Sequence, residues 1–160
     1  MSGRLIGELH CHHDHLTDYP NDLLRDKLGS QWMSKLETLF PGAEHFRAGL
    51  CRFVERFPHE VICQDCDTAE GAAKQQIQAD SYFSFAPPEI THFVTSTPNA
   101  KHRIDRDIAT SLWRKEIDGL ERRKRFVQRA VKALLAGDFW SAGYSFNSWH
   151  YHHRTHRANS

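Results

Sequence analysis

Residues 61–74 of the chain read VICQDCDTAEGAAK. The β-branched residues that open this stretch favour a short strand, and the pair Cys63-x-x-Cys66 follows at once. Asp67 then stands at the start of a helical pattern, where its side chain can act as the N-cap. We therefore predict a compact unit in which a strand, a cysteine pair and a helix follow one another.

A second segment, HCHHDH at residues 10–15, is rich in histidine, and the chain around it has enough extended character for a strand. Alternate side chains of a strand share a face, so His10 and His12 would point one way and Cys11 and His13 the other. Imidazole is a common metal ligand and transfers protons well near neutral pH. This strand can therefore offer a metal ligand and a general base side by side.

The histidine segment by itself is compatible with three metal-dependent chemistries. A metallo-hydrolase of the metallo-β-lactamase type would use four of its side chains, His10, His12, Asp14 and His15. A PHP-type phosphoesterase motif begins with a similar His-x-His. The pair of adjacent histidines at positions 12 and 13 instead resembles the first element of a nuclease with a ββα-metal core. The first two folds are larger than this chain allows around the segment, and neither accounts for residues 61–74.

Taken together, the two segments resemble the HNH (His-Me finger) nucleases, especially the endonuclease VII branch. That branch combines a segment ending in Asp-His with a later Cys-x-x-Cys pair, followed by Asn and by Ala-Glu-Gly at the start of a helix. This chain has Asp14-His15 in the first segment and Ala69-Glu70-Gly71 in the second. The resemblance covers residues 8–17 and 58–78, and it implies an α+β fold with a small ββα-metal core.

The resemblance also implies a role for each matching residue. His13 takes the position of the general base, and His12 takes that of the metal ligand before it. Asp67 stands where the motif has Asn or His and becomes the second metal ligand, while Glu70 matches a functional acid and is counted as catalytic. Two protein ligands suffice for Mg²⁺, which keeps several waters and takes substrate oxygens, so we expect Mg²⁺ or Mn²⁺ here.

Cys63 and Cys66 match half of a structural zinc site, which the resemblance makes a second expected cofactor. The other cysteine pair of the branch is missing from this sequence. Because structural zinc almost always has four ligands, a complete site would need Cys51 and Cys11, or histidines in their place. The N-terminus lacks the apolar stretch of a signal peptide, so we interpret the cysteines as metal ligands or a redox pair before disulfides.

Charge is divided unevenly along the chain. Residues 1–100 carry 8 Lys/Arg and 14 Asp/Glu, net −6, whereas residues 101–160 carry 13 and 6, net +7. A basic half joined to an acidic, His-rich half favours an anionic polymer as partner. We expect DNA, duplex or branched, and leave a homodimer open. The predicted contact is a basic run, Arg122, Arg123, Lys124 and Arg125.

Apolar residues at helical spacing predict a helical insertion at about residues 18–57, between the two strands, and a long helix at residues 105–136. We divide the chain into a nuclease core at residues 1–80 and a helical basic region at residues 81–160. The tail of that region, residues 139–160, is rich in His, Arg and aromatic side chains. No apolar run reaches transmembrane length, and we expect a cytoplasmic, bacterial or phage-encoded protein without a membrane partner.

The combined expectation is an endonuclease that hydrolyses DNA phosphodiester bonds. His13 would activate water, and a divalent ion held by His12 and Asp67 would stabilise the leaving 3′-oxygen. Because Asp67 replaces the usual Asn, a second hypothesis stays open, a zinc-stabilised nucleic-acid-binding module whose site has lost catalysis. DNA cleavage that depends on His13 separates the two.

Overall fold

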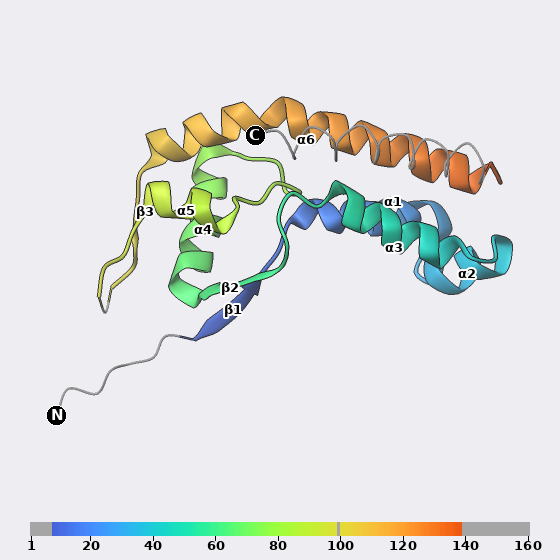
Figure 1. Ribbon diagram of the computed structural model, residues 1–160, viewed down its shortest axis with the longest axis horizontal. Coiled ribbons are helices and arrows are strands. Elements are labelled where there is room, and N and C mark those ends of the chain that lie inside the picture. Colours follow the sequence, from blue (N-terminus) through green and yellow to red (C-terminus); the bar gives the residue numbers. More distant parts are fainter. Residues whose placement is uncertain (1–7, 99, 139–160) are drawn as a thin grey trace, which may run out of the picture. The chain divides into compact units, whose positions relative to one another are not determined.

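The computed structural model describes residues 8–98 and 100–138 of the chain, so the predicted tail at residues 139–160 lies outside the described residues. The fold is α+β, with two small antiparallel sheets and a larger helical part (Figure 1). This confirms the predicted fold class and the helical C-terminal half.

The chain forms two compact units. Among the described residues, the first unit contains residues 8–15, 56–98 and 100–120, and the second contains residues 16–55 and 121–138. This division differs from a boundary at residue 80. The chain leaves the first unit after its first strand and returns for the second strand, and the last helix is long enough to contribute to both units.

An antiparallel hairpin and the helix after it form the centre of the first unit. Strand β1 (Leu9–His12) pairs with β2 (Glu60–Cys63), and His12 lies opposite Glu60. Helix α4 (Gln64–Ile77) follows β2 without a loop (Figure 1). The predicted order of strand, cysteine pair and helix is therefore confirmed, and the two segments that are far apart in the sequence are hydrogen-bonded neighbours.

Helix α4 begins earlier than predicted, at Gln64 rather than at Asp67. Its N-cap is Cys63, whose Sγ accepts the backbone N–H of Cys66 at 3.2 Å. Asp65 and Asp67 lie in the first turn, where negative charge interacts favourably with the helix dipole. The prediction that Asp67 is the N-cap is wrong because a sulfur acceptor takes that place, and Asp67 instead projects from the helix itself.

The remaining elements of the first unit pack around an aromatic core. They are α5 (Pro87–Phe93), β3 (Val94–Thr95), β4 (Arg103–Ile104) and the first part of α6 (Arg106–Leu135). Helix α5 begins with two prolines, and the side chain of Glu89 accepts the N–H of Ala86 at 2.7 Å. Phe85 contacts Phe83 and Phe93 with ring centroids 4.7 and 4.6 Å apart.

A buried carboxylate fixes the chain where it re-enters the first unit. Asp14 is 1% exposed, and its Oδ2 accepts the backbone N–H of Arg56 at 2.8 Å. The Arg56 side chain donates to the Ser84 carbonyl at 3.0 Å and pairs with Glu89 at 2.6 Å. Asp14 and Arg56 therefore join the end of β1, the start of the return segment and α5.

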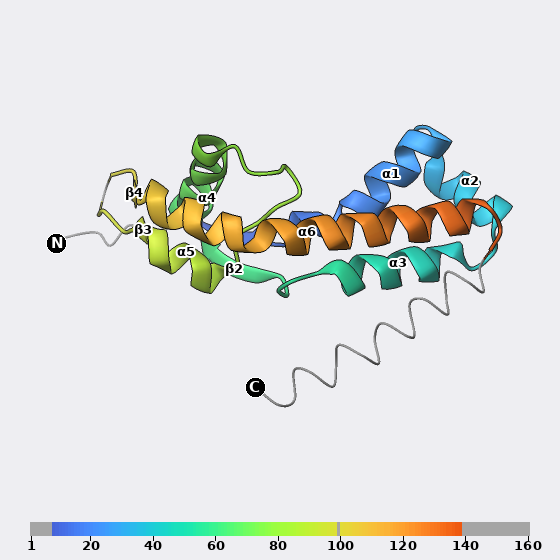
Figure 2. The same cartoon turned by 90° about the horizontal axis from the view of Figure 1, so that it is seen from above.

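The second unit is helical. The predicted insertion forms a 3₁₀ turn, η1 (His15–Thr17), and three helices, α1 (Tyr19–Leu28), α2 (Trp32–Leu39) and α3 (Ala43–Val54). Figure 2 shows α1 and α3 along the second part of α6. Phe53 of α3 contacts Phe126 with ring centroids 4.8 Å apart, and Gln128 donates to the Tyr19 hydroxyl at 2.7 Å.

The long helix ends where the sequence predicts. Gly137 has a φ of +75°, and its N–H donates to the Leu134 carbonyl at 3.0 Å. A left-handed residue at this position is the usual C-terminal cap, and glycine adopts it without steric cost. None of the helices in the described ranges combines the length and apolar character of a membrane-spanning helix.

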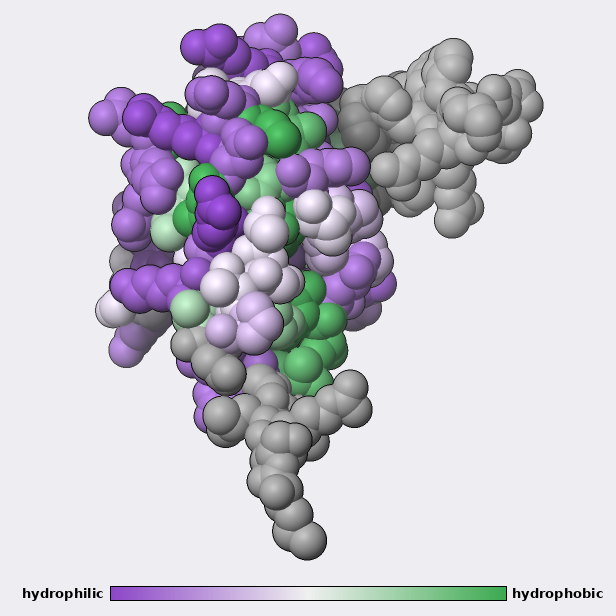
Figure 3. All heavy atoms as spheres, turned by 90° about the vertical axis from the view of Figure 1, so that its left-hand side faces the viewer, coloured by the Kyte–Doolittle hydropathy of each residue, from purple (hydrophilic) through white to green (hydrophobic). Residues whose placement is uncertain are grey.

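Apolar side chains also reach the surface of the first unit. Figure 3 shows small hydrophobic areas among the hydrophilic side chains. Leu9 and Val61, on the two paired strands, are 68% and 66% exposed. Singly exposed apolar side chains are normal in folded proteins, and nothing in the structure indicates what would cover these two.

Replacing Asp14 with Ala should lower the free energy of unfolding by about 1–3 kcal/mol, because it leaves the partly buried N–H of Arg56 without its carboxylate acceptor. Urea unfolding followed by circular dichroism measures the change. Asp118→Asn, at an exposed position of α6, is the control and should change the value by less than about 0.5 kcal/mol. Equal stabilities of the parent and Asp14→Ala would contradict the anchoring role.

Candidate functional site

The hairpin and helix α4 bring His12 and Asp67 together. The two residues are 55 positions apart, yet Nδ1 of His12 lies 3.1 Å from Oδ1 of Asp67. His12 is the last residue of β1 and is 3% exposed, whereas the Asp67 side chain is 36% exposed. The separation is well within the roughly 4–5 Å that one bridging metal ion requires. The two predicted ligands therefore meet at the solvent-facing edge of the unit.

The other ring nitrogen of His12 determines where its proton lies. Nε2 is 2.8 Å from the backbone carbonyl oxygen of Phe85, which can only accept a hydrogen bond. Nε2 must therefore be protonated and donate. The ring also stacks on Phe57, with centroids 5.4 Å apart and planes 10° from parallel. These contacts fix the ring orientation and direct Nδ1 at Asp67.

A neutral His12 ring protonated on Nε2 has a lone pair on Nδ1, which faces a carboxylate oxygen. Two acceptors at 3.1 Å repel each other unless a cation lies between them. That cation is either a proton shared by the two side chains or a metal ion. In an octahedral Mg²⁺ site with bonds of roughly 2.1 Å, neighbouring ligands lie about 3.0 Å apart. The spacing of the His12 and Asp67 atoms is therefore suited to coordination.

His10 approaches the same carboxylate from the same face of β1. Its Nδ1 lies 3.3 Å from Oδ2 of Asp67, and its side chain is 43% exposed. Asp67 thus has one imidazole beside each of its two oxygens. The sequence predicts that His10 and His12 share a strand face, and their common partner confirms it.

The predicted general base, His13, lies in a cluster of three imidazoles. Its ring centroid is 4.9 Å from that of His15 and 5.4 Å from that of His59. His59 directly precedes β2, so its position follows from the strand pairing. His13 is partly exposed, and water can therefore reach it. His59 has no role in the sequence-based prediction, and the structure places it beside the predicted base.

Glu70 is placed differently from a residue that touches substrate. It is 2% exposed, its Oε1 accepts the N–H of Phe85 at 3.1 Å, and its Oε2 pairs with Lys74 at 3.1 Å. Lys74 also donates to the Phe83 carbonyl at 3.2 Å and lies 3.5 Å from Nδ1 of His15. We therefore correct the predicted catalytic role of Glu70 to a positioning role, because it holds the segment whose carbonyl orients His12.

The metallo-hydrolase alternative, which uses His10, His12, Asp14 and His15, is not assembled as one ligand set. Asp14 is committed to the backbone of Arg56. Within residues 8–98 and 100–138, the only group of three or more metal-binding side chains whose ligand atoms all lie within 4.8 Å of one another is elsewhere. The structure gives this alternative no geometric support, and we do not pursue it.

That group consists of Cys63, Cys66 and His102. Nε2 of His102 lies 4.0 Å from Sγ of Cys63. Burial and the neighbouring Cys63 raise the pKa of the Cys66 thiol to about 12 in the metal-free protein. Of the partners that the sequence leaves open, two cysteines or histidines in their place, this group has a histidine. Among the described residues, His102 joins the pair, and neither Cys11 nor Cys51 does.

Cys51 and Cys11 have other surroundings. Cys51 belongs to α3 of the second unit, where Arg47 approaches its Sγ at 3.8 Å. Burial raises the pKa of the Cys51 thiol. Cys11 is exposed on the face of β1 opposite to His10 and His12. Sequence spacing alone could not show that Cys51 is separated from Cys63 and Cys66, because Cys51 belongs to the insertion and the cysteine pair belongs to the first unit.

The four cations of the basic run on α6 fall into two pairs, one that makes contacts within the protein and one that is exposed. Arg123 donates to the Val54 carbonyl at 3.1 Å, and Lys124 lies over the Tyr19 ring at 5.5 Å and 3.7 Å from Glu121. These two cations are part of the second unit's packing. Arg122 and Arg125 are exposed, so only half of the predicted run is freely presented to an anionic partner.

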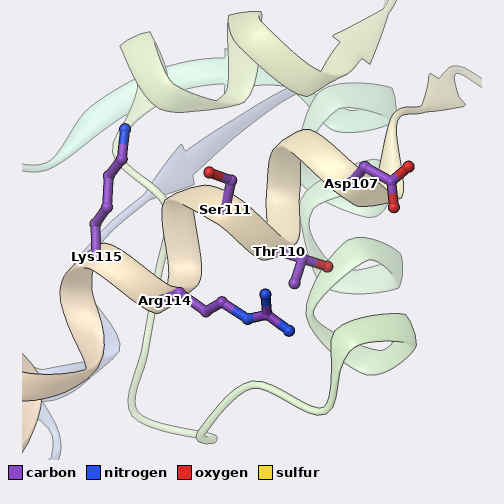
Figure 4. A pocket seen from close by; sticks show the side chains of 5 residues that line it. All are labelled: Asp107, Thr110, Ser111, Arg114 and Lys115. Carbon is purple, nitrogen blue, oxygen red and sulfur yellow. The ribbon is translucent and has the colours of Figure 1, made fainter.

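A shallow depression on the first part of α6 is a separate feature (Figure 4). Its lining is one face of the helix, formed by Asp107, Thr110, Ser111, Arg114 and Lys115. In Figure 4 the Arg114 side chain extends in the direction of Thr110, whereas Lys115 extends away from it. The depression contains none of the predicted site residues and has no histidine or cysteine in its lining.

Comparison of the chain with protein-family models, curated proteins and solved structures gives no match. We therefore infer the function from the geometry of the described residues and from the sequence motifs.

Burial raises the pKa of Glu70 above its ordinary value of 4.5, although Lys74 and the Phe85 N–H oppose the shift. The folded protein then binds this proton more tightly than the unfolded chain. As the pH rises from below about 4 through the raised pKa, the parent should lose stability relative to Glu70→Gln, on the order of 1 kcal/mol. Glutamine keeps an acceptor for the Phe85 N–H.

Urea unfolding at a series of pH values measures this difference. Glu60→Gln, at an exposed position of β2, is the control and should follow the parent. A Glu70→Gln curve parallel to that of the parent at every pH would show that burial does not disfavour the Glu70 carboxylate.

Proposed function

We propose that this protein is a metal-dependent endonuclease that hydrolyses phosphodiester bonds in DNA. One observation carries the proposal, the 3.1 Å approach of His12 Nδ1 to Asp67 with the opposite ring nitrogen fixed on a backbone carbonyl. A strand residue and a helix residue, separated by a long insertion, are thereby held as a preorganised pair. The resemblance to the endonuclease VII branch of HNH nucleases assigns these same two positions to the metal.

The residues fit a hard divalent ion such as Mg²⁺ or Mn²⁺. Asp67 supplies a partly exposed carboxylate and His12 a neutral imidazole, and such an ion keeps open positions for water and phosphate oxygens. When bound, the ion would stabilise the charge that develops on the leaving 3′-oxygen. The protein holds the ligands for it before substrate arrives, which reduces the cost of organising the site.

His13 is the general base in this proposal. It directly follows the metal ligand His12 in sequence, it is partly exposed, and it contacts two further imidazoles. A neutral imidazole can take a proton from water near neutral pH. His15 and His59 limit the orientations of the His13 ring. Glu70 acts indirectly, as a positioning residue. It accepts the N–H of Phe85, whose carbonyl in turn orients the His12 ring.

DNA binding is the less specific part of the proposal. Arg122 and Arg125 are exposed on α6, and the C-terminal 60 residues carry a net charge of +7. Exposed cations contact phosphates without reading sequence, so these two residues support affinity rather than specificity. A cytoplasmic location and a homodimer remain predictions from the sequence.

The His13→Ala variant should cleave supercoiled plasmid ~10²–10⁴-fold more slowly than the parent in Mg²⁺ or Mn²⁺, because the general base is lost. Conversion to nicked and linear DNA on agarose gels measures the rate. His92→Ala, at an exposed position of α5, is the matched control and should cleave like the parent.

Two results would overturn the assignment. Equal rates for His13→Ala and the parent would remove His13 from the mechanism. A parent that binds DNA but does not cleave it with either metal would favour the alternative, a nucleic-acid-binding module whose site has lost catalysis.

Replacing Arg122 and Arg125 with Ala should weaken DNA binding and flatten its salt dependence. Each phosphate contact contributes about −0.9 to the slope of log K against log salt, so losing two contacts should reduce the slope by about 1.8. Fluorescence anisotropy with labelled duplex, in EDTA to prevent cleavage, measures both quantities. The control removes two exposed cations from α1, Arg25 and Lys27, and should leave the slope unchanged. Equal slopes for both double variants would locate DNA binding elsewhere.

A further inference from the structure

We propose that Cys63, Cys66 and His102 bind one zinc ion, and that this ion joins the β3–β4 hairpin to the start of helix α4. The site is separate from the His12/Asp67 pair and does not depend on the proposed nuclease activity. The sequence leaves the partners of the cysteine pair open between Cys51, Cys11 and histidines, and the structure points to one particular histidine, His102.

The three ligand atoms are arranged around one point. They all lie within 4.8 Å of one another, and Cys63 Sγ is 4.0 Å from His102 Nε2. In a tetrahedral zinc site with Zn–S bonds of about 2.3 Å and Zn–N bonds of about 2.0 Å, such atoms lie roughly 3.5–3.8 Å apart. Small side-chain movements would therefore complete the coordination. Three protein ligands leave the fourth position to water.

The backbone around the cysteine pair is suited to thiolate ligands. Cys63 ends β2 and caps α4, and its Sγ accepts the N–H of Cys66 at 3.2 Å. The first turn of the helix therefore directs a hydrogen-bond donor at the Cys63 sulfur and holds the two cysteines close together. All three side chains are half-buried, so the ion would be partly shielded from water.

The position of His102 gives the ion a structural task. His102 directly precedes β4, in the connection that follows β3. Strands β3 and β4 are each two residues long, and a hairpin of this size is at best marginally stable by itself. A metal bond to α4 would fix the hairpin to the helix that carries Asp67.

Metal binding requires one local change in this connection. Nδ1 of His102 accepts the N–H of Thr97 at 3.3 Å, so the neutral ring has its proton on Nε2, the atom that faces Cys63. A zinc ion must take the place of that proton, and the ring proton then moves to Nδ1. The Thr97 amide has to turn away from Nδ1 when the metal binds. This change supplies a spectroscopic marker of His102 ligation.

Titration of the reduced full-length protein with Co²⁺, which reports on zinc sites, tests the proposal. We expect the sulfur-to-cobalt absorption of a two-thiolate site to saturate at one Co²⁺ per chain. The His12/Asp67 pair has no sulfur and cannot produce this signal, even if it also binds Co²⁺. Zn²⁺ should displace the Co²⁺, and elemental analysis should find one tightly held zinc per chain. His102→Ala should weaken zinc binding by at least ~10–100-fold, the range that even outer-shell partners of a metal site cost.

Two controls match these variants. His92→Ala removes an exposed histidine of the same unit, and Cys11→Ser removes the exposed cysteine that the sequence offers as a ligand. Both should bind Zn²⁺ and Co²⁺ like the parent. Variants of Cys63 or Cys66 could fail to fold, but the parent can be tested without them. After zinc addition, the nitrogen NMR resonances of the His102 ring should show a metal-bound Nε2 and a protonated Nδ1.

The contrary results are specific. Absence of sulfur-to-cobalt absorption in the reduced protein would overturn the site. Unchanged zinc affinity in His102→Ala would exclude His102, and a loss in Cys11→Ser as large as in His102→Ala would mean a different ligand set. Oxidation of Cys63 and Cys66 to a disulfide in the presence of excess zinc would show that the pair is a redox couple instead.

Discussion

The two hydrogen-bonding contacts of the buried His12 ring are the constraint on which the candidate site depends. Nε2 donates to the Phe85 carbonyl at 2.8 Å, and Nδ1 faces Asp67 at 3.1 Å. The first contact restricts the second, because it places a proton on Nε2. Nδ1 then either has a lone pair facing Asp67, or shares a proton or a metal ion with it. Burial strengthens this requirement, since an unsatisfied polar atom in a low-dielectric interior is costly.

Several distant parts of the first unit must be in place for this geometry. The β1–β2 pairing positions His12, the register of α4 positions Asp67, and Glu70 holds the Phe85 backbone from the next turn of the same helix. Helix α4 therefore supplies both a candidate ligand and the support for its partner. Asp14 fixes the chain where it returns from the insertion, at Arg56, a few residues before β2.

The sequence predicts the elements of this arrangement better than it predicts the contacts between distant segments. Strand periodicity is enough to put His10 and His12 on one face, and the order of residues 61–74 is enough to predict β2 followed by α4. Glu70 looks catalytic from its motif, but only the fold reveals that it is buried against Phe85. No spacing rule connects His102 with Cys63, because two helices, α4 and α5, and strand β3 intervene. The run at residues 122–125 likewise gives no sign that Arg123 and Lys124 are used in packing.

We propose that His12 and Asp67 share a divalent ion, and a crystal structure of the protein grown with Mn²⁺ would show whether they do. Anomalous scattering locates the metal without reference to activity. We expect a peak at roughly 2.0–2.2 Å from both His12 Nδ1 and an Asp67 oxygen, with Nε2 still donating to the Phe85 carbonyl. A metal bound elsewhere, with His12 Nδ1 and Asp67 still in direct contact, would contradict it and leave the pair as a hydrogen bond between a protonated imidazole and a carboxylate.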